Sequence, residues 1–506
     1  MEQGLWYGLQ NGSDIRGIAL EGVAGESVNL TSEQANAIGQ AFARWLSDTL
    51  EKPFSQLKIG VGRDSRLSGP MLARGLAEGL MAIGVEVSDF GLASTPAMFM
   101  STVSDQQDEI GPYDGAVMIT ASHLPFNRNG FKFFTAKGGL DKQDIRSLLN
   151  LAAECVYLPC TQTAQSVDFM AVYAAGLVET VRQAIDHPTH YAQPLTGLKI
   201  IVDAGNGAGG FYVDRVLRPL GADTTGSQFL EPDGRFPNHI PNPEDAAAMA
   251  SIRDAVIRYQ ADFGIIFDTD VDRSAAVDES GHEFNRNRLI ALISAILLKQ
   301  YPGATIVTDS VTSDGLTDFI ENQLKGRHHR FKRGYKNVIN EAIRLNNEGV
   351  FTPLAIETSG HAALKENYFL DDGAYLVTKL LVELAKAKLN QQSLASLVSS
   401  LNEPIEALEK RYLIQQSDFQ TYGKNVLAAL EKFVAEQDDW QLAPNSFEGI
   451  RVSCQGLDQQ GWFLLRLSLH DPVLALNIEA DVKGGVDSIF TRLSGFLAGF
   501  DSLQQR

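Results

Sequence analysis

Short runs of β-forming residues alternate with helix-forming stretches along most of this chain, and this alternation constrains the fold more than any other feature. The run Leu57–Val61 precedes a helical stretch at Met71–Ile83, and further β-type runs follow at Val85–Phe90 and Ala116–Thr120. Strands that alternate with helices are typical of a parallel or mixed sheet covered by helices. The sequence therefore predicts the α/β class.

The pattern restarts at Leu198–Val202, where a helix is expected from about Phe211, and again near Arg286. It changes in the final part of the chain, where a long helix at Asp418–Glu436 precedes three strands and a last helix. At about 150 residues per domain, 506 residues allow three or four domains. We predict three α/β domains with mixed sheets and a C-terminal α+β domain, at 1–190, 191–285, 286–403 and 404–506.

Composition narrows the possible partners. Hydrophobic residues make up 44% of the chain and the formal net charge is −19. An acidic surface repels nucleic-acid backbones and anionic lipid, so we expect neither nucleic acid nor membrane as a partner. No signal peptide is recognisable, and the longest apolar stretch, Leu289–Leu298, is too short to span a bilayer. Together with only three cysteines, these features predict a cytoplasmic protein.

The first candidate site is the segment Thr120-Ala121-Ser122-His123-Leu124-Pro125, which follows an apolar strand. Ser122 would lie at the carboxyl end of that strand, where ligands bind in open α/β sheets. Lys132 follows nearby, but the G-x-S-x-G pattern of a hydrolase is missing. From these residues alone, a serine in a polar turn beside a surface histidine is the preferred interpretation.

The second candidate site is Asp268-Thr269-Asp270-Val271-Asp272-Arg273, after the apolar run Phe263–Phe267. Three carboxylates this close repel one another unless a cation binds, and oxygen ligands favour Mg²⁺, Ca²⁺ or Mn²⁺. An EF-hand does not fit, because Arg273 stands where that loop needs glycine and a strand precedes the loop. We predict a Mg²⁺ loop rather than a solvated acidic loop, with Arg273 pairing with a carboxylate or reaching an anion.

Three further patterns are weaker. Glu357-Thr358-Ser359-Gly360-His361 suits hydrogen bonds to sugar hydroxyls, although an ordinary polar turn is the simpler interpretation. Arg466 and Ser468, with His470 close by, could hold a phosphate. The spacing of Gly205, Gly207 and Gly210, with Glu231 about twenty residues on, leaves a dinucleotide site open.

In this order the motifs resemble those of the α-D-phosphohexomutase family, which includes phosphoglucomutase and phosphomannomutase. The resemblance covers nearly the whole chain and implies four domains around a central cleft. The matching segments are the D-I-R-G motif at Asp14–Gly17, G-R-D-x-R at Gly62–Arg66, the phosphoserine loop T-x-S-H-x-P at Thr120–Pro125 with Asn129–Lys132 after it, the metal loop D-x-D-x-D-R at Asp268–Arg273, a short loop at Gly334–Lys336, and the sugar loop E-x-S-G-H at Glu357–His361.

One loop departs from the family pattern. The last domain of the family usually carries R-x-S-G-T-x-P, and here Arg466, Ser468 and Pro472 match it. Leu469 replaces the glycine and His470 replaces the threonine. Because glycine lets a phosphate approach the backbone closely, leucine would change the phosphate-binding loop. The substitution bears on how the chain holds a distal phosphate.

The resemblance implies that phosphorylated Ser122 transfers its phosphoryl group to a hexose phosphate, assisted by Mg²⁺. The implied metal ligands are Ser122, Asp268, Asp270 and Asp272. The implied catalytic group, in which Lys132 acts as acid or base and the arginines supply positive charge, consists of Ser122, His123, Lys132, Arg16, Arg63 and Arg273, with Arg66 close to the serine. The implied substrate-binding residues are Lys336, Glu357, Ser359, His361, Arg466, Ser468 and His470.

We therefore expect a phosphoglucomutase-like enzyme that interconverts glucose 1-phosphate and glucose 6-phosphate through glucose 1,6-bisphosphate. The altered loop motivates an alternative, a hexose 1,6-bisphosphate synthase that releases the bisphosphate and is recharged by a donor such as fructose 1,6-bisphosphate. A further alternative is a catalytically idle regulator that binds sugar phosphate, although the intact serine and metal loops argue against it. The sequence leaves the hexose and the oligomeric state open.

Overall fold

The computed structural model describes residues 2–104, 112–444, 446–468 and 471–505, which form four β-sheets with helices on their faces. This arrangement confirms the α/β class with a sheet-rich C-terminal domain. The chain divides into two compact units, each described separately below. Unit 1 comprises Met1–Phe284, Ser359–Ala362 and Leu370–Leu394, and unit 2 comprises Asn285–Thr358, Ala363–Phe369 and Ala395–Arg506. Among the described helices, none has both the length and the apolar character needed to cross a membrane.

The first sheet of unit 1 has the strand order β1-β2-β6-β5-β3-β4-β8, with β7 paired to β6. Strand β3 is parallel to β4 and β5, whereas β6 is antiparallel to β5 and β2. The sheet is therefore mixed, as the sequence predicts. Its strands are β1 (Gln10–Asn11), β2 (Asp14–Ile18), β3 (Lys58–Arg63), β4 (Glu86–Leu92), β5 (Gly115–Ile119), β6 (Arg128–Thr135), β7 (Gly138–Gly139) and β8 (Gln165–Ser166).

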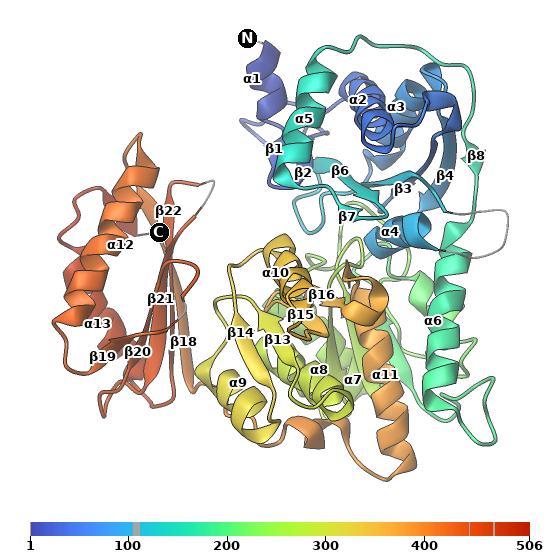
Figure 1. Ribbon diagram of the computed structural model, residues 1–506. Helices are drawn as coiled ribbons and strands as arrows, with labels where there is room; N and C mark the ends of the chain where they lie inside the picture. The colour runs from blue at the N-terminus through green and yellow to red at the C-terminus, as the bar shows by residue number, and fades with distance from the viewer. Residues whose placement is uncertain (1, 105–111, 445, 469–470, 506) are drawn as a thin grey trace. The chain divides into compact units, whose positions relative to one another are not determined.

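Helices cover both faces of this sheet, with α2, α3 and α5 on one side and α4 on the other (Figure 1). Helix α2 begins with a capping box formed by Thr31 and Gln34, and it buries Ile38, Phe42 and Leu46 along one face. The helices of this part are α1 (Glu2–Tyr7), α2 (Ser32–Leu50), α3 (Gly69–Ala82), α4 (Thr95–Val103) and α5 (Lys142–Ala153), with the short helix Phe54–Gln56.

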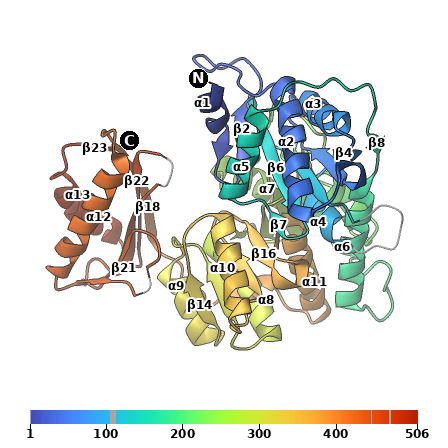
Figure 2. The same cartoon turned by 45° about the horizontal axis from the view of Figure 1, so that its top comes forward.

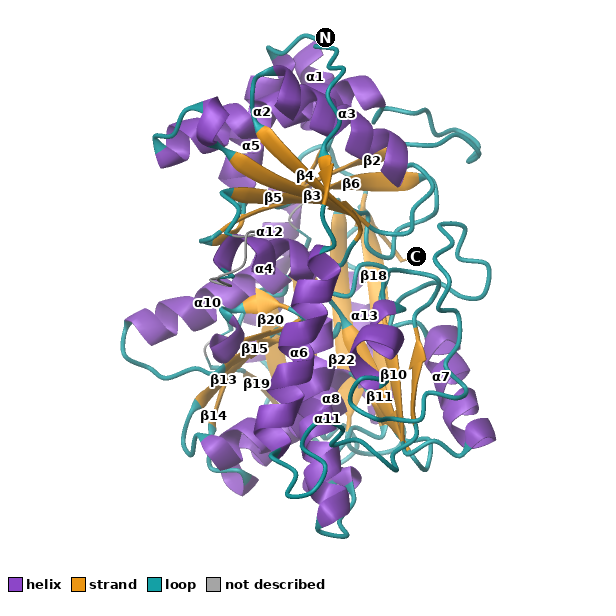
Figure 3. Ribbon diagram, turned by 90° about the vertical axis from the view of Figure 1, so that its right-hand side faces the viewer, coloured by secondary structure: helices purple, strands orange, loops and turns teal. Residues whose placement is uncertain are grey.

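The second sheet of unit 1 has the order β12-β11-β10-β9, in which β10 is parallel to β9 and antiparallel to β11. Its strands are β9 (Ile200–Asp203), β10 (Phe263–Phe267), β11 (Ser274–Asp278) and β12 (Glu283–Phe284). Helices α6 (Phe169–Ile185) and α11 (Gly373–Leu389) lie side by side (Figures 1 and 3), and α7 (Ala246–Tyr259) packs on β10.

The helix expected from about Phe211 begins at that residue and is short, with Phe211 and Tyr212 followed by the π-helical segment Val213–Leu217. Pro219 follows closely, and a proline both lacks an N–H donor and disfavours helical backbone in the residue before it. A longer helix of this part is α7, whose first turn is capped by Asp245 through two backbone N–H groups.

Unit 2 contains a sheet in which β13 is parallel to both β14 and β15. Helix α10 packs against β13 and β15 through Val338, Ala342 and Leu345. The elements of this part are α8 (Arg286–Gln300), β13 (Thr305–Thr308), α9 (Asp314–Asp318), the π-helix Phe319–Gln323, β14 (Arg327–Arg330), α10 (Tyr335–Asn347), β15 (Leu354–Ile356) and the short helix Lys365–Asn367. The strand β17 (Leu370–Asp371) belongs to unit 1, and β16 (Ala362–Leu364) and the short helix Leu394–Val398 each begin at the last residue of a unit 1 segment.

The C-terminal sheet of unit 2 is antiparallel throughout, in the order β19-β20-β21-β22-β18-β23. Helices α12 and α13 share one face of it and close a core of leucine, isoleucine, valine and aromatic side chains (Figure 2). The elements are β18 (Glu406–Ile414), α12 (Phe419–Ala435), β19 (Trp440–Leu442), β20 (Ile450–Cys454), β21 (Gly461–Leu467), β22 (Val473–Ala480), α13 (Gly485–Leu497) and β23 (Leu503–Gln505).

Candidate functional site

Ser122 lies just beyond the carboxyl end of β5, in a turn with left-handed backbone (φ 49°). A residue other than glycine is strained in this conformation and persists there only when neighbouring contacts hold it. One such contact is the hydrogen bond from the Ser122 backbone N–H to Thr120 Oγ1, at 2.8 Å. The turn leaves the serine buried but close to the loop that follows β10.

Arg66 supplies the other contacts that hold this turn. Its side chain has no exposed surface, and the ring of Phe236 lies over the guanidinium at 5.2 Å from the ring centroid. The guanidinium donates to four backbone carbonyls, those of Ser122 (2.5 Å), Leu124 (2.5 Å), Pro125 (2.8 Å) and Arg128 (2.9 Å). Planar guanidinium donors in a fixed fork suit such a set of acceptors. Arg66 therefore shapes the serine turn rather than merely adding charge beside it.

The Ser122 hydroxyl contacts the acidic loop between β10 and β11. Its Oγ donates to Asp268 Oδ2 at 3.1 Å and accepts from Arg273 Nη2 at 3.1 Å. Arg273 also binds Asp268 through Nε and Nη2, so the arginine pairs with a carboxylate as the sequence predicts. All three side chains are buried. The serine thus lies between a carboxylate and a guanidinium.

The three aspartates of the loop converge, because Val271 takes a left-handed backbone conformation (φ 68°) between Asp270 and Asp272. Carboxylate oxygens of Asp268, Asp270 and Asp272 all lie within 4.8 Å of one another, and all three side chains are buried. Thr95, the first residue of α4, donates to Asp270 Oδ2 at 2.5 Å and fixes the loop against the first sheet.

These aspartates fit a divalent cation. Burial and the carboxylates of Asp272 and Asp270 raise the pKa of Asp268 well above its usual range. Within the described residues, Asp270 Oδ1 and Asp272 Oδ1 are buried without a hydrogen-bond partner. Buried carboxylate oxygens without partners are costly, and an oxygen-preferring cation such as Mg²⁺ would satisfy them.

Lys132 and His361 supply positive charge to the same cluster. The Lys132 ammonium, on β6, contacts Asp272 and also Asp270 Oδ2 at 3.0 Å. Burial opposes ionisation of Asp272, but Lys132, His361 and Arg273 outweigh it and hold its pKa below the usual range. Burial also disfavours the His361 imidazolium, but Asp371 and Asp272 outweigh it and raise the pKa of His361 to about 9.

His361 is held in place by a hydrogen bond from Nδ1 to Asp371 Oδ2, at 2.5 Å. Asp371 was not a sequence-based candidate, because a lone acid in the segment Leu370–Asp371 carries no motif. The pair keeps the imidazole protonated near neutral pH, so His361 is a hydrogen-bond donor at this site.

His123, Arg16 and Arg63 lie around the serine at the same edge of the first sheet. Burial, Arg273 and Arg16 lower the pKa of His123, and its Nδ1 accepts from Arg273 Nη2 at 2.7 Å. Arg16 pairs with Asp14 at 2.8 Å on β2. Arg63 lies opposite Ile119 at the end of β3, and no hydrogen bond from its guanidinium occurs within the described residues.

The glycine-rich turn after β9 has a packing role that accounts for its spacing. A Cβ on Gly207 would lie 2.6 Å from the carbonyl oxygen of Thr269, inside the acidic loop. A Cβ on Gly210 would lie 2.6 Å from the carbonyl oxygen of Leu230, and Gly205 has a positive φ of 53°. The glycines therefore let backbones approach closely, so the motif needs no dinucleotide to explain it.

The remaining candidates divide between the two units. Ser359 and His361 belong to unit 1, whereas Lys336, Glu357, Arg466 and Ser468 belong to unit 2. Buried Glu357 accepts a hydrogen bond from the backbone N–H of Gly334 at 2.6 Å, which joins the sugar loop to the segment that carries Lys336. His470, together with Leu469, lies outside the described residues.

Arg466 and Ser468 lie at the end of β21. Arg466 Nη1 is 3.5 Å from Glu448 Oε1, while its Nε is buried without a hydrogen-bond partner within the described part of unit 2. Ser468 Oγ accepts from the backbone N–H of Asp471 at 3.2 Å. The Arg466 guanidinium is thus only partly satisfied by the protein.

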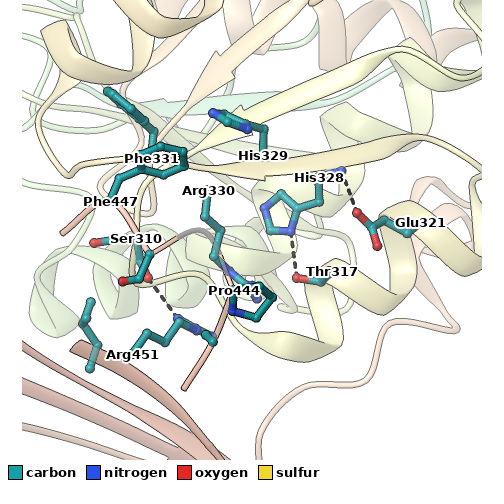
Figure 4. A pocket seen from close by; sticks show the side chains of 13 residues that line it. Ser310, Thr317, Glu321, His328, His329, Arg330, Phe331, Pro444, Phe447 and Arg451 are labelled. Atoms are coloured by element: carbon teal, nitrogen blue, oxygen red, sulfur yellow. Dashed lines mark hydrogen bonds between the residues drawn. The ribbon is translucent and has the colours of Figure 1, made fainter. Parts of the chain in front are cut away.

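A cavity of about 260 Å³ lies between residues of β14 and the segment that leads into β20, in unit 2 (Figure 4). Phe331 and Phe447 form one side of it, and Arg330 and Arg451 form another. Both arginines donate to Asp314 Oδ1, at 2.9 and 2.8 Å, and so tie β14 to β20. Because both guanidinium groups are already paired with Asp314, the cavity is a gap at the β14–β20 junction rather than an open anion site.

Three family models match this chain and are described as phosphoglucomutase/phosphomannomutase alpha/beta/alpha domains I, II and III, at residues 8–153, 175–281 and 285–404. A phosphomannomutase/phosphoglucomutase of Pseudomonas putida is 32% identical, over 93% of this chain and 92% of the relative. The chain belongs to the phosphoglucomutase/phosphomannomutase family. The resemblance seen in the sequence motifs is confirmed, and the chain is an enzyme of the phosphohexomutase type.

Other members of the family show the same similarity over almost the full length. A phosphoglucomutase of Neisseria gonorrhoeae is 28% identical, over 96% of this chain and 95% of the relative. A solved structure of a phosphoglucomutase/phosphomannomutase family protein from Burkholderia thailandensis has a TM-score of 0.77 at 26% identity, covering 98% of this chain and 97% of the other.

Proposed function

We propose that this phosphohexomutase interconverts glucose 1-phosphate and glucose 6-phosphate through a phosphorylated Ser122 and a bound glucose 1,6-bisphosphate. The observation that carries the proposal is the place of the Ser122 hydroxyl, 3.1 Å from both Asp268 Oδ2 and Arg273 Nη2. A strained turn that presents one hydroxyl to a buried acidic loop supports phosphoryl transfer and serves no evident packing purpose. The names of the curated relatives support the substrate class.

Asp268, Asp270 and Asp272 would hold a Mg²⁺ ion together with Ser122. The ion would neutralise charge on the transferring phosphoryl group. The chain's own residues do the rest: Arg273 donates toward the phosphoryl oxygens, and Arg66 keeps the serine turn in position. The ion also explains how a strongly acidic chain accommodates an anionic substrate.

In the first half-reaction, the phosphorus–oxygen bond to Ser122 breaks as a bond to a hexose hydroxyl oxygen forms. In the second, the other phosphoryl group of the bisphosphate leaves its hexose oxygen and bonds to the Ser122 oxygen, which restores the phosphorylated serine. The hydroxyl proton must leave, and Lys132, whose nitrogen contacts the metal loop, is the proposed acceptor once it has lost its own ammonium proton. His361, kept protonated by Asp371, donates a hydrogen bond to the substrate. Glu357 and Ser359 would bind sugar hydroxyls, while Lys336, Arg466 and Ser468 would hold the phosphate that is not reacting.

Phosphorus NMR of the purified protein with Mg²⁺ and glucose 1-phosphate tests this proposal. With a catalytic amount of glucose 1,6-bisphosphate, glucose 6-phosphate should become the main product. Ser122→Ala should abolish turnover, because the phosphoryl carrier is lost. Unchanged activity of that variant would refute the phosphoserine mechanism, and an absence of turnover by the native chain would favour an idle sugar-phosphate regulator.

A bisphosphate synthase is the second candidate, favoured by Leu469 in the distal phosphate loop. A weaker grip on that phosphate favours release of the bisphosphate before it reorients. The same NMR experiment with added fructose 1,6-bisphosphate distinguishes the two. Stoichiometric build-up of glucose 1,6-bisphosphate with loss of the donor indicates the synthase, whereas a donor needed only in trace amounts indicates the mutase.

A further inference from the structure

Glu448, on the segment just before β20, occupies the surroundings of the arginine proposed to hold the distal phosphate. Its Oε2 accepts from Ser310 Oγ at 2.7 Å and from the backbone N–H of Arg333 at 2.9 Å. Its Oε1 faces Arg466 Nη1 at 3.5 Å. One carboxylate oxygen is therefore firmly anchored, while the other makes a long contact with Arg466.

The backbone forces this proximity. Gly449 has a positive φ of 60°, and a Cβ there would lie 2.2 Å from the carbonyl oxygen of Leu465. Strand β20 pairs with β21 from Ile450 and Leu465 onward, so Glu448 enters the sheet directly beside Arg466. Side chains of both residues are largely buried, at 16% and 17% exposure, which limits solvent screening between them.

The charge around this site is unfavourable for a phosphate dianion. Three carboxylates interact electrostatically with Arg333 or Arg466, namely those of Asp309, Glu409 and Glu448. Asp309 is fully buried, and burial raises its pKa, with the Glu448 carboxylate adding to the effect. Glu409 is 42% exposed and already bound to an arginine of its own strand. Glu448 is therefore the carboxylate that most directly opposes an anion at Arg466.

We propose that Glu448 competes with the distal phosphate of the substrate for Arg466, and so sets how long the hexose bisphosphate stays bound. The proposal rests on the proposed function. A phosphate on Arg466 must displace Oε1 while Oε2 stays on Ser310 and Arg333, which leaves two anions close together. Like charges in a shielded site cost binding free energy, so affinity for the bisphosphate is held down. A mutase needs retention and a synthase needs release, and Glu448 shifts the chain toward release.

Isothermal titration calorimetry of the full chain with glucose 1,6-bisphosphate tests the proposal, in Mg²⁺ and on a Ser122→Ala background that prevents turnover. Glu448→Gln keeps an acceptor oxygen for Ser310 and Arg333 but removes the charge, so we expect binding about tenfold tighter. In the protein that retains Ser122, Glu448→Gln should lower the share of bisphosphate released per turnover, measured by phosphorus NMR. Unchanged or weaker binding by Glu448→Gln would overturn the proposal.

Glu409→Gln is the matched control, because it removes one carboxylate near Arg466 that is exposed and already paired. It should change the affinity much less than Glu448→Gln, and an equal gain would overturn the specific role of Glu448. Glu448→Asp keeps the charge but withdraws it by one methylene, so its affinity should fall between the native and Gln proteins. If the native chain fails to interconvert hexose phosphates, the proposed function is refuted. If the native chain is active but Glu448→Gln binds the bisphosphate with unaltered affinity, only this inference is refuted.

Discussion

Replacing Arg66 by lysine separates geometry from charge at the serine turn. The guanidinium donates to four carbonyls and has no exposed surface. A lysine keeps the charge, but its compact ammonium has three donors on one nitrogen and cannot reproduce the fork. Losing two such bonds to a charged donor costs about 3 to 6 kcal/mol, since each contributes about 1.5 to 3 kcal/mol. The turn would then relax from its left-handed conformation.

We therefore expect Arg66→Lys to lower the melting temperature and to reduce kcat/KM about 100-fold, because a displaced nucleophile loses its orientation. Thermal unfolding and steady-state kinetics measure the two effects. Arg63→Lys is the control for stability, since the described residues contain no hydrogen bond from the Arg63 guanidinium. A native melting temperature and native turnover in Arg66→Lys would show that charge alone suffices, and would refute the reasoning.

Three further predictions follow from the packing and the charges. Burial raises the pKa of Glu479 to about 7, above its value in the unfolded chain. The ionised carboxylate therefore destabilises the fold at pH 8, whereas the protonated carboxyl at pH 4 does not. Glu479→Gln keeps an acceptor for Trp462 Nε1. It should raise the unfolding free energy at pH 8 by about 3 kcal/mol and leave it unchanged at pH 4, and an equal gain at both pH values contradicts this account. Gly207→Ala places a Cβ 2.6 Å from the carbonyl oxygen of Thr269, so both melting temperature and turnover should fall, and native values would show that the loop yields freely. Mg²⁺ should raise the melting temperature of the native chain, and Asp268→Asn should abolish that rise. Without metal, the variant's melting temperature should change little, because the pKa of Asp268 is already raised. A full Mg²⁺ response in the variant would exclude Asp268 as a ligand.

The sequence predicts the layers of this fold well where local patterns decide them. The run Phe263–Phe267 is β10 over those same residues, because a short apolar run beside turn residues has few alternatives to a buried strand. The helix expected from Phe211 is present but short, also for a local reason, since Pro219 follows it closely. Strand order and the pairing of β6 with β2 depend on distant segments, which periodicity does not reveal.

The same distinction between local pattern and distant packing applies to the site. The spacing of the three aspartates within one loop predicts their convergence, and the structure brings them together. The contact of Thr95 with Asp270 joins segments 175 residues apart, and a threonine at a helix start carries no signal of it. Arg66 is visible in a motif, but its burial beneath the serine turn depends on tertiary packing. Glu448 has no motif at all, and only the register of β20 and β21 places it beside an arginine.

The phosphorylation state of Ser122 during turnover tests the central claim most directly. The protein would be incubated with glucose 1,6-bisphosphate and Mg²⁺, freed of small molecules, and examined by intact mass and peptide mapping before and after addition of glucose 1-phosphate. If the bisphosphate used for this incubation carries phosphoryl groups labelled with heavy oxygen, the account predicts one labelled phosphoryl group on Ser122. That group passes to the sugar phosphate and an unlabelled one replaces it as glucose 6-phosphate forms. Turnover without any phosphoryl group on Ser122, or a labelled phosphoryl group that stays on the protein while glucose 6-phosphate forms, would contradict it.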